Sequence, residues 1–268
     1  MGTLYIIATP IGNLGDITLR ALEVLKSVDL VACEDTRQTV KLLNHYNIAK
    51  PLVSYFQHSK LSKIGYIAGE LAAGKNIALV TDAGTPGISD PGGKIIEHVT
   101  CNMKQGASIK IIPIPGPSAV IAALSISGFP ADKFIFMGFP PHKKGRNKFF
   151  EEVAAAEQTM VFYESTHRIL KTLGQLASSL RGALSRSSGL TRSNPPVNLF
   201  LVKGNLSSDP PLMKGEKERG LRQIVVCREL TKMFESIYRG TAEEILNILN
   251  SDKDNQKGEF VIVVKKYE

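Results

Sequence analysis

The sequence predicts a two-domain α/β protein, and three observations support this fold class. The chain has 268 residues, which is the length of about two ordinary domains. Short apolar runs alternate with amphipathic stretches along the chain. The apolar runs lack the strict alternation of half-exposed strands, so we expect sheets covered by helices on both faces. We place the domain boundary near residues 113–115, which gives an N-terminal domain over 1–114 and a C-terminal domain over 115–268.

In the N-terminal domain, apolar runs are expected to form strands, and stretches with helical spacing are expected to form helices. The first helix is expected to use Asp16 as its N-cap, and the second is expected to stop at Gly74. The expected strands cover residues 4–8, 30–33, 76–81 and 109–114, and the expected helices cover 16–28, 59–73 and 94–99.

The C-terminal domain continues the same alternation until it is interrupted. Thr241 and Glu244 fit a capping box at the start of a late helix. Residues 181–222 contain paired serines, paired prolines and dispersed glycines, which predicts a flexible insertion with at most one short strand at 197–202. The other expected strands cover residues 134–139, 159–163 and 260–265, and the expected helices cover 116–127, 148–156 and 166–180.

The net charge of the chain is +8, which suits a polyanionic partner such as RNA. Residues 181–222 hold eight Lys/Arg and three Asp/Glu, so charge supports RNA binding by the rest of the chain only weakly. A generic solvated surface is the alternative. The three cysteines are scattered, and no stretch is long enough to span a membrane. We therefore expect a reduced, cytoplasmic location. The dispersed histidines predict no metal site.

Glycine-, proline- or polar-rich motifs follow several of the expected strands. The most informative is 82–92, which holds more turn residues than a connector needs, together with two acids and two hydroxyls. It lies where α/β sheets place their ligands. Each motif alone could be a plain turn, but several polar strand ends in one chain favour a shared cleft. The remaining motifs are 9–16, 115–119, 162–168 and 228–232.

Taken together, these motifs resemble the tetrapyrrole methylase superfamily. The resemblance covers nearly the whole chain except 181–222. Within the superfamily the chain looks similar to the branch that methylates a cytidine ribose in small-subunit (16S) ribosomal RNA. The motifs that carry this resemblance are ATPIGNLGD (8–16), CEDTR (33–37), DAGTPGISDPG (82–92), PGPSA (115–119), FYESTHR (162–168) and RELTK (228–232).

The resemblance implies a separate mixed sheet in each domain, S-adenosylmethionine bound in the cleft between the domains, and a homodimer. It implies 16S ribosomal RNA or the small ribosomal subunit as the partner, with no membrane. Thr166 departs from the proline that is common in the family at this position. The implied donor contacts are Pro10, Thr85, Ile88, Ser118, Ala119, Tyr163, Cys227 and Gly258. The implied substrate contacts are Glu164, His167, Arg168, Arg228 and Lys232.

A methyl transfer to a ribose hydroxyl needs aligned reactants and a group that accepts the hydroxyl proton. Alignment supplies much of the acceleration, and a general base adds about 10²–10⁴-fold. We expect Glu34, Asp35 and Arg37 to lie at the acceptor, with Asp35 preferred to Glu34 as the base. Glu164 and His167 are further candidates. The alternative for the cluster is that Arg37 pairs with an acid only to hold a loop.

Two rival functions stay open at this point. Other branches of the superfamily methylate corrin or porphyrin precursors, although the CEDTR and RELTK segments favour RNA by resemblance. A non-catalytic RNA-binding or assembly factor is the second rival, and the intact set of acids and donor residues argues against it. No P-loop motif is present, so a P-loop nucleotidase is not expected.

Overall fold

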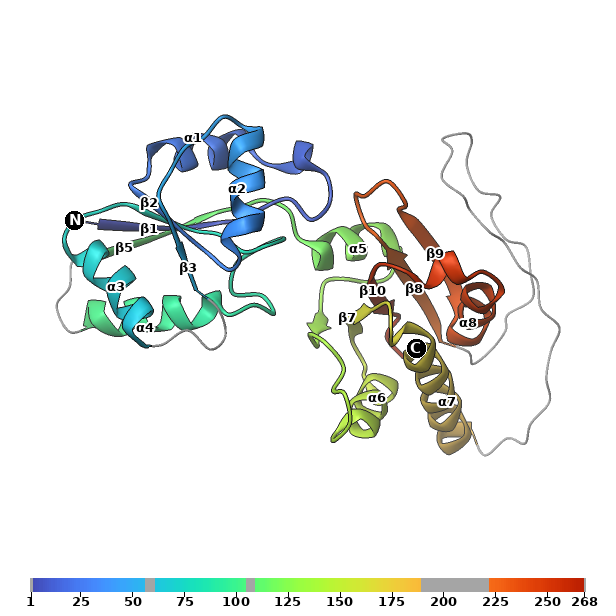
Figure 1. Ribbon diagram of the computed structural model, residues 1–268. Coiled ribbons are helices and arrows are strands. Elements are labelled where there is room, and N and C mark those ends of the chain that lie inside the picture. Colours follow the sequence, from blue (N-terminus) through green and yellow to red (C-terminus); the bar gives the residue numbers. More distant parts are fainter. Residues whose placement is uncertain (1, 56–60, 105–108, 189–221, 268) are drawn as a thin grey trace. The chain divides into compact units, whose positions relative to one another are not determined.

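The structure is a computed structural model that describes residues 2–55, 61–104, 109–188 and 222–267 (Figure 1). The chain divides into two compact units, Met1–Ala119 and Val120–Glu268. Among the described residues, none of the helices is long and apolar enough to cross a membrane.

The first unit is built on a five-stranded sheet in the order β3-β2-β4-β1-β5. Every neighbouring pair in it is parallel, so the expectation of a mixed sheet is wrong for this domain. The physical reason is that a helix follows each of the first four strands, and such crossovers return the chain in the same direction. The strands are β1 (Gly2–Ile7), β2 (Leu30–Cys33), β3 (Leu52–Ser54), β4 (Ile77–Leu79) and β5 (Ile109–Ile114).

Helices cover both faces of this sheet, as the apolar strands predict (Figure 1). Helices α1 (Leu19–Ser27) and α2 (Thr36–His45) pack on one face through Leu25 and Leu43. Helices α3 (Leu61–Ala72) and α4 (Gly92–Lys104) pack on the other through Leu71 and Val99. The first unit is therefore a three-layer sandwich.

The entry to α1 differs from the sequence prediction. Asp16 belongs to a short 3-10 helix, η1 (Leu14–Asp16), and the N-cap of α1 is Thr18. The Thr18 hydroxyl accepts a hydrogen bond from the amide of Ala21 at 3.2 Å. The predicted Asp16 cap is thus wrong, because the chain makes a separate turn before α1 begins.

The second unit has a mixed sheet in the order β6-β7-β10-β8-β9. Strands β6 and β7 are parallel and the other pairs are antiparallel, as expected for a mixed sheet. Its strands are β6 (Phe134–Phe136), β7 (Thr159–Ser165), β8 (Gln223–Arg228), β9 (Ser236–Thr241) and β10 (Glu259–Val264).

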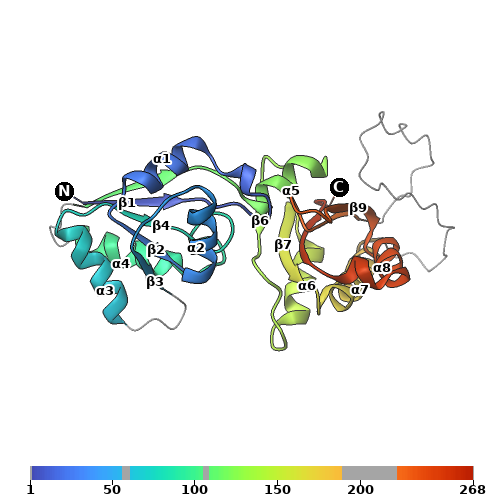
Figure 2. The same cartoon turned by 45° about the horizontal axis from the view of Figure 1, so that its top comes forward.

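Three helices, α6 (Arg146–Ala155), α7 (Ile169–Ser188) and α8 (Ala242–Ser251), bury one face of this sheet in a single apolar core (Figure 2). On the other face, Arg239 donates to the carbonyl of Ser127 at 2.9 Å, at the end of α5 (Ala119–Ser127). The predicted capping box is confirmed, because Thr241 and Glu244 exchange hydrogen bonds at the start of α8. A short 3-10 helix, η2 (Lys253–Gln256), follows.

The predicted flexible insertion is wrong at its two ends. Helix α7 continues to Ser188, and Arg222 is buried and donates to the carbonyl of Val153 at 2.7 Å. Residues 189–221, including the expected strand at 197–202, lie outside the described residues.

Candidate functional site

The loops that follow β1, β4 and β5 are joined to one another at the carboxyl edge of the first sheet. The backbones of Thr9 and Gly84 exchange two hydrogen bonds, of 2.9 and 3.0 Å. The Thr9 hydroxyl donates to the carbonyl of Thr81 at 3.0 Å, and the Thr85 hydroxyl donates to the carbonyl of Pro117 at 3.2 Å. Three motifs that are distant in sequence therefore form one connected surface, at the edge where parallel sheets bind ligands.

Two glycines allow these loops to approach closely. Gly84 has a φ of 83°, a conformation that side chains disfavour. A β-carbon on Gly116 would lie 3.0 Å from the β-carbon of Ala8. The lack of side chains at these two positions lets the loops pack closely, with Gly84 buried and Gly116 exposed.

The 82–92 loop is braced by one of its own acids. The carboxylate of Asp90 accepts hydrogen bonds from the amides of Gly87 at 2.8 Å and Gly92 at 2.6 Å. Ser89 adopts a φ of 61°, which the brace holds in place. The same loop leaves Ile88 half-exposed at its surface.

The first five predicted donor contacts all lie on these connected loops. Pro10 is buried, Thr85 is half-buried and bonded to the third loop, and Ile88 is exposed. Ser118 and Ala119 are half-buried at the start of α5. The structure therefore brings these five residues to one edge, although their contacts with a donor stay a prediction.

An acidic cluster formed by Glu34 and Asp82 lies beside these loops, where β2 and β4 end. The Thr81 hydroxyl donates to Oε2 of Glu34 at 3.0 Å, and the amide of Asp35 donates to Oδ1 of Asp82 at 3.1 Å. Burial raises the pKa of Glu34. The hydrogen bond from Thr81 lowers this pKa, and the negative charges of Asp82 and Asp90 raise it. Burial also raises the pKa of Asp82. Both carboxyls are more basic than ordinary surface acids.

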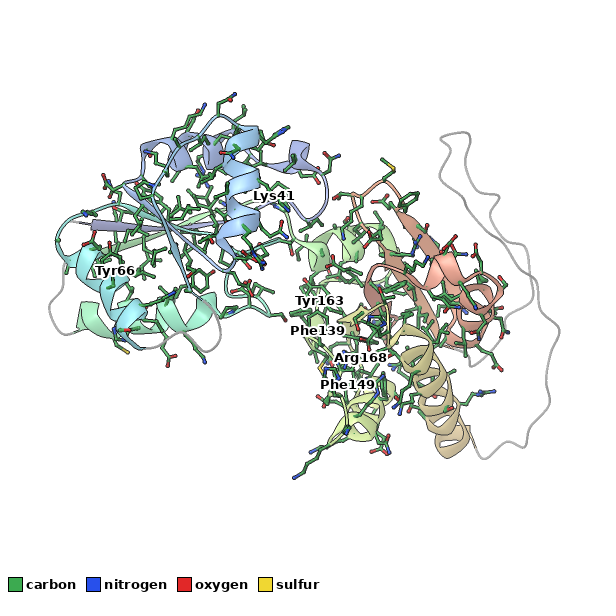
Figure 3. All side chains as sticks on the ribbon, viewed as in Figure 1. Lys41, Tyr66, Phe139, Phe149, Tyr163 and Arg168 are labelled. Atoms are coloured by element: carbon green, nitrogen blue, oxygen red, sulfur yellow. The ribbon has the colours of Figure 1, made fainter. Side chains whose placement is uncertain are left out.

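Asp35 has the opposite electrostatics. It is the N-cap of α2, and its carboxylate accepts the amide of Arg37 at 2.8 Å and the guanidinium Nη2 at 2.6 Å. The hydrogen bonds from Arg37 lower the pKa of Asp35 to about 2. Lys41 of the same helix, which Figure 3 labels, adds a smaller lowering effect. The expected pair of Arg37 with an acid is present, and it holds the start of α2.

In the second sheet, strand alternation separates the predicted donor contacts from the predicted substrate contacts. Tyr163 and Cys227 both pair with Val261 and share the face that bears Arg239. Glu164 and Arg228 both pair with Phe260 and point to the face covered by α6, α7 and α8. The sequence-based expectation that all of these residues share one cleft is therefore wrong for Glu164 and Arg228.

Tyr163 lies at the end of β7 in an aromatic group. Its ring centroid is 5.0 Å from that of Phe136 and 5.3 Å from that of Phe139, and Figure 3 shows Tyr163 and Phe139 together. Burial raises the pKa of the Tyr163 hydroxyl, while a bond to the backbone of Val120 lowers it. Burial likewise raises the pKa of the Cys227 thiol to about 12, so this thiol stays neutral.

Gly258 sits at the start of β10 in a conformation that excludes side chains. Its φ is 113°, which strains any other residue. A β-carbon at this position would also lie 2.5 Å from Cγ of Glu229. The amide donates to the hydroxyl of Thr166 at 2.8 Å. The threonine that departs from the family pattern thus ties the end of β7 to the start of β10.

Glu164 is fully buried and holds two arginines. Its carboxylate accepts Nε of Arg168 at 2.8 Å and the hydroxyl of Thr172 at 2.5 Å, and it lies 3.8 Å from Nη2 of Arg146. Its side chain has no exposed surface. The predicted substrate contact by Glu164 is replaced by a structural role inside the second unit, and Arg168 is engaged in the same cluster.

The remaining predicted substrate contacts have different surroundings. Arg228 is buried and donates to the carbonyls of Lys257, Phe234 and Asp254 at 2.6, 3.1 and 2.8 Å, so its guanidinium holds loops. Lys232 pairs with Glu229 and Glu259, each at 2.9 Å. His167 is exposed.

Arg146 is the clearest residue that sequence reasoning missed. It belongs to a run of basic residues, 143–148, that looks like a solvated surface. Its side chain is nevertheless 4% exposed, because the carboxylate that attracts it comes from β7. No local signal marks it.

The chain is similar to characterised families along nearly its whole length. The family model described as Tetrapyrrole (Corrin/Porphyrin) Methylases matches residues 3–246. A Halalkalibacterium halodurans protein named Ribosomal RNA small subunit methyltransferase I is 41% identical over 265 residues, covering 98% of this chain and 76% of that protein. The Escherichia coli O157:H7 protein of the same name is 40% identical over 268 residues, covering 100% of this chain and 79% of that protein.

Solved structures agree on the fold. The methyltransferase CobJ matches with a TM-score of 0.60 at 15% identity, covering 99% of this chain and 93% of that one. The cobalt precorrin-4 methyltransferase CbiF matches with a TM-score of 0.60 at 18% identity, covering 98% and 94%. At such identities the likeness concerns the fold alone. The family model and the relatives near 40% identity give the assignment: the chain belongs to the tetrapyrrole (corrin/porphyrin) methylase family.

Proposed function

We propose that this protein uses S-adenosylmethionine to methylate the 2′-hydroxyl of a cytidine ribose in small-subunit ribosomal RNA. The observation that carries the proposal is the similarity, near 40% identity over almost the whole chain, to proteins named for that class of substrate. A tetrapyrrole substrate is less favoured, because the structural matches named for a precorrin or a uroporphyrin substrate share only 18% identity or less.

The chemistry of the first unit supports a sulfonium donor. Glu34, Asp82 and Asp90 give the carboxyl edge a negative charge that suits a cation, and no side chain covers the backbone at the exposed Gly116. S-adenosylmethionine supplies a methyl group already activated by its positive sulfur. The chain therefore has to bind, orient and deprotonate, and no further activation is needed.

Within this proposal, Glu34 is the better proton acceptor and Asp35 is the organising residue. A general base works best when its pKa is close to the working pH. The raised pKa of Glu34 brings it nearer to that condition, whereas the pKa of Asp35, about 2, takes it further away. The electrostatics thus favour Glu34 over the order of preference that the sequence suggested.

The proposal is tested by offering the protein two acceptors. Purified protein is incubated with methyl-labelled S-adenosylmethionine and either small ribosomal subunits that lack ribose methylation or a tetrapyrrole precursor. Label on a cytidine ribose, located by mapping methylated riboses, is the expected result. Label only in the tetrapyrrole overturns the proposal, and label in neither favours a non-catalytic RNA-binding factor.

Three further parts belong to the same proposal. The small ribosomal subunit is the partner, the protein acts as a homodimer, and it works in the cytoplasm, where ribosomes are assembled. Sedimentation equilibrium at micromolar concentration tests the dimer directly. A monomer at that concentration removes the dimer from the proposal and leaves the activity untouched.

A further inference from the structure

The loop between β6 and α6 and the first turn of α6 combine an exposed aromatic ring with exposed lysines. Phe139 is 52% exposed, and Lys143, Lys144 and Lys148 are all exposed. Residues 139–148 read FPPHKKGRNK, with four Lys/Arg and no Asp or Glu. Within the described part of the chain, no ion pair engages these three lysines.

The backbone of this loop is held by the buried Arg146 and the half-buried Arg168. Nη1 of Arg168 donates to the carbonyl of Pro140 at 2.9 Å, and Nη1 of Arg146 donates to the carbonyl of Pro141 at 3.1 Å. Both arginines belong to the buried cluster around Glu164. The loop is also fixed at its start, where the amide of Tyr163 donates to the carbonyl of Gly138 at 2.8 Å.

Buried charges lose hydration, and a buried ion cluster is weak evidence for stability in itself. A single exposed aromatic residue is ordinary on a protein surface. Here, however, the two arginines donate hydrogen bonds to the carbonyls of the two residues that directly follow Phe139. The cluster therefore fixes where the ring and the lysines stand.

We propose that residues 139–148 form an RNA-binding element in which Phe139 stacks on a nucleobase and Lys143, Lys144 and Lys148 contact phosphates. An aromatic ring beside a basic segment is the combination that binds single-stranded RNA, because bases stack on rings and phosphates attract lysines. This inference rests on the proposed function and extends it to the surface that holds the substrate. Glu164, Arg146 and Arg168 act as positioning residues for this element.

The ring is assigned to the RNA because of its position. Phe139 lies beyond the end of β6, next to the lysines, and more than half of its surface faces solvent. Tyr163, the predicted donor contact, lies 5.3 Å from it between ring centroids and is half-buried. If the Phe139 ring instead stacked on the adenine of the donor, removing the ring would lower donor affinity. Donor affinity is therefore the second quantity to measure.

The experiment compares variants of the full chain with small ribosomal subunits that lack ribose methylation as the probe. Phe139→Ala is expected to raise the KM for subunits about 5- to 160-fold, the range for loss of one stacked base, with kcat changed much less. Phe139→Tyr keeps a ring and should restore most of the affinity. The affinity for S-adenosylhomocysteine, measured by calorimetry, should stay at the wild-type value in both variants.

The lysines are tested by the dependence of subunit binding on salt. Replacing Lys143, Lys144 and Lys148 together with Gln should lower the slope of log K against log salt by about 2, because single-stranded RNA contributes about 0.7 per phosphate contact. The matched control replaces the exposed residues Lys26, Lys110 and Lys133 with Gln, which removes the same charge elsewhere. The control should keep the wild-type slope.

The outcomes separate this inference from the proposed function. If the wild-type protein methylates no subunits, the proposed function fails first. If the wild type is active but Phe139→Ala keeps its KM, or loses donor affinity instead, the RNA-binding element is overturned. Equal slopes in the two triple variants overturn the phosphate contacts.

Discussion

The hydroxyl of Thr81 donates to the carboxylate of Glu34 across 3.0 Å, and this bond joins the end of β4 to the end of β2. Glu34 is half-buried beside Asp82, so its pKa is raised by burial and by the neighbouring charge. Asp35, the next residue, is turned toward Arg37 and is strongly acidic. Two adjacent carboxyls thus have opposite acidities, which allows their roles to be separated by experiment.

Glu34→Gln should lower kcat for methyl transfer by about 10²–10⁴-fold, the usual contribution of a general base. The ionised carboxylate is the active form, so wild-type kcat should fall as pH drops through the raised pKa of Glu34. The acid limb should disappear in the variant. A limb that persists in Glu34→Gln would assign it to another group.

Asp35→Asn should keep the fold, because Asn is also a good N-cap. The depressed pKa of Asp35 contributes stability above the ordinary pKa of an aspartate, and that contribution is lost as pH falls toward about 2. The free energy of unfolding should therefore be higher for the wild type than for the variant at neutral pH. The two values should converge in strong acid. A loss of kcat in Asp35→Asn as large as in Glu34→Gln would restore Asp35 as the base.

Gly258→Ala should destabilise the second unit by more than about 1 kcal/mol, because an alanine would be strained at a positive φ and would collide with Glu229. Urea unfolding measures the effect. Gly69→Ala is the control, since an added β-carbon on this exposed position of α3 meets nothing within 4 Å. That change should be neutral or stabilising by about 0.5–1 kcal/mol. Equal stability of the two variants would contradict the assigned constraint.

Glu164→Gln should cost about 3–5 kcal/mol of unfolding free energy, because it leaves the buried Arg146 and the half-buried Arg168 without their carboxylate. Glu243→Gln breaks the exposed pair with Arg181, in which both side chains are more than half exposed, and should cost less than about 1 kcal/mol. Chemical denaturation of both variants tests the difference. A mild effect at Glu164 would mean that water or relaxation replaces the lost charge.

Thiol labelling provides a test of burial in the native protein. Cys33 and Cys227 are buried and Cys101 is exposed, and burial raises the pKa of both buried thiols. Because the thiolate is the reactive form, one cysteine should react rapidly in the folded protein and three after denaturation. Rapid labelling of Cys227 without denaturant would show that the second sheet opens.

The sequence predicts the fold class, the strand-end location of the motifs and the Thr241 cap, because these depend on local patterns. It misses α2 and β3 for a physical reason. The buried face of α2 has only Thr39 and Leu43, and β3 is three half-buried residues long, so neither gives a clear period. Strand β9 is missed likewise, since only Tyr238 and Thr241 in it are buried.

The candidate site is predicted in part. The motifs on the first sheet are found because glycine, proline and acids cluster locally after strands. The opposite faces of Tyr163 and Glu164 follow from strand alternation and could have been predicted from their adjacent numbers. The burial of Arg146 could not, because it depends on a contact with β7 that pairs residues 18 positions apart.

The hydrogen bonds of Thr9 with Gly84 and of Thr85 with Pro117 have a consequence for protein engineering. Because the three loops are tied by two backbone bonds and by the Thr85 hydroxyl, a grafted loop that follows a different backbone path or lacks this threonine would lose its bonds to the other loops. Exchange of substrate or donor preference between members of the family should therefore succeed only when the three segments are transplanted as a set.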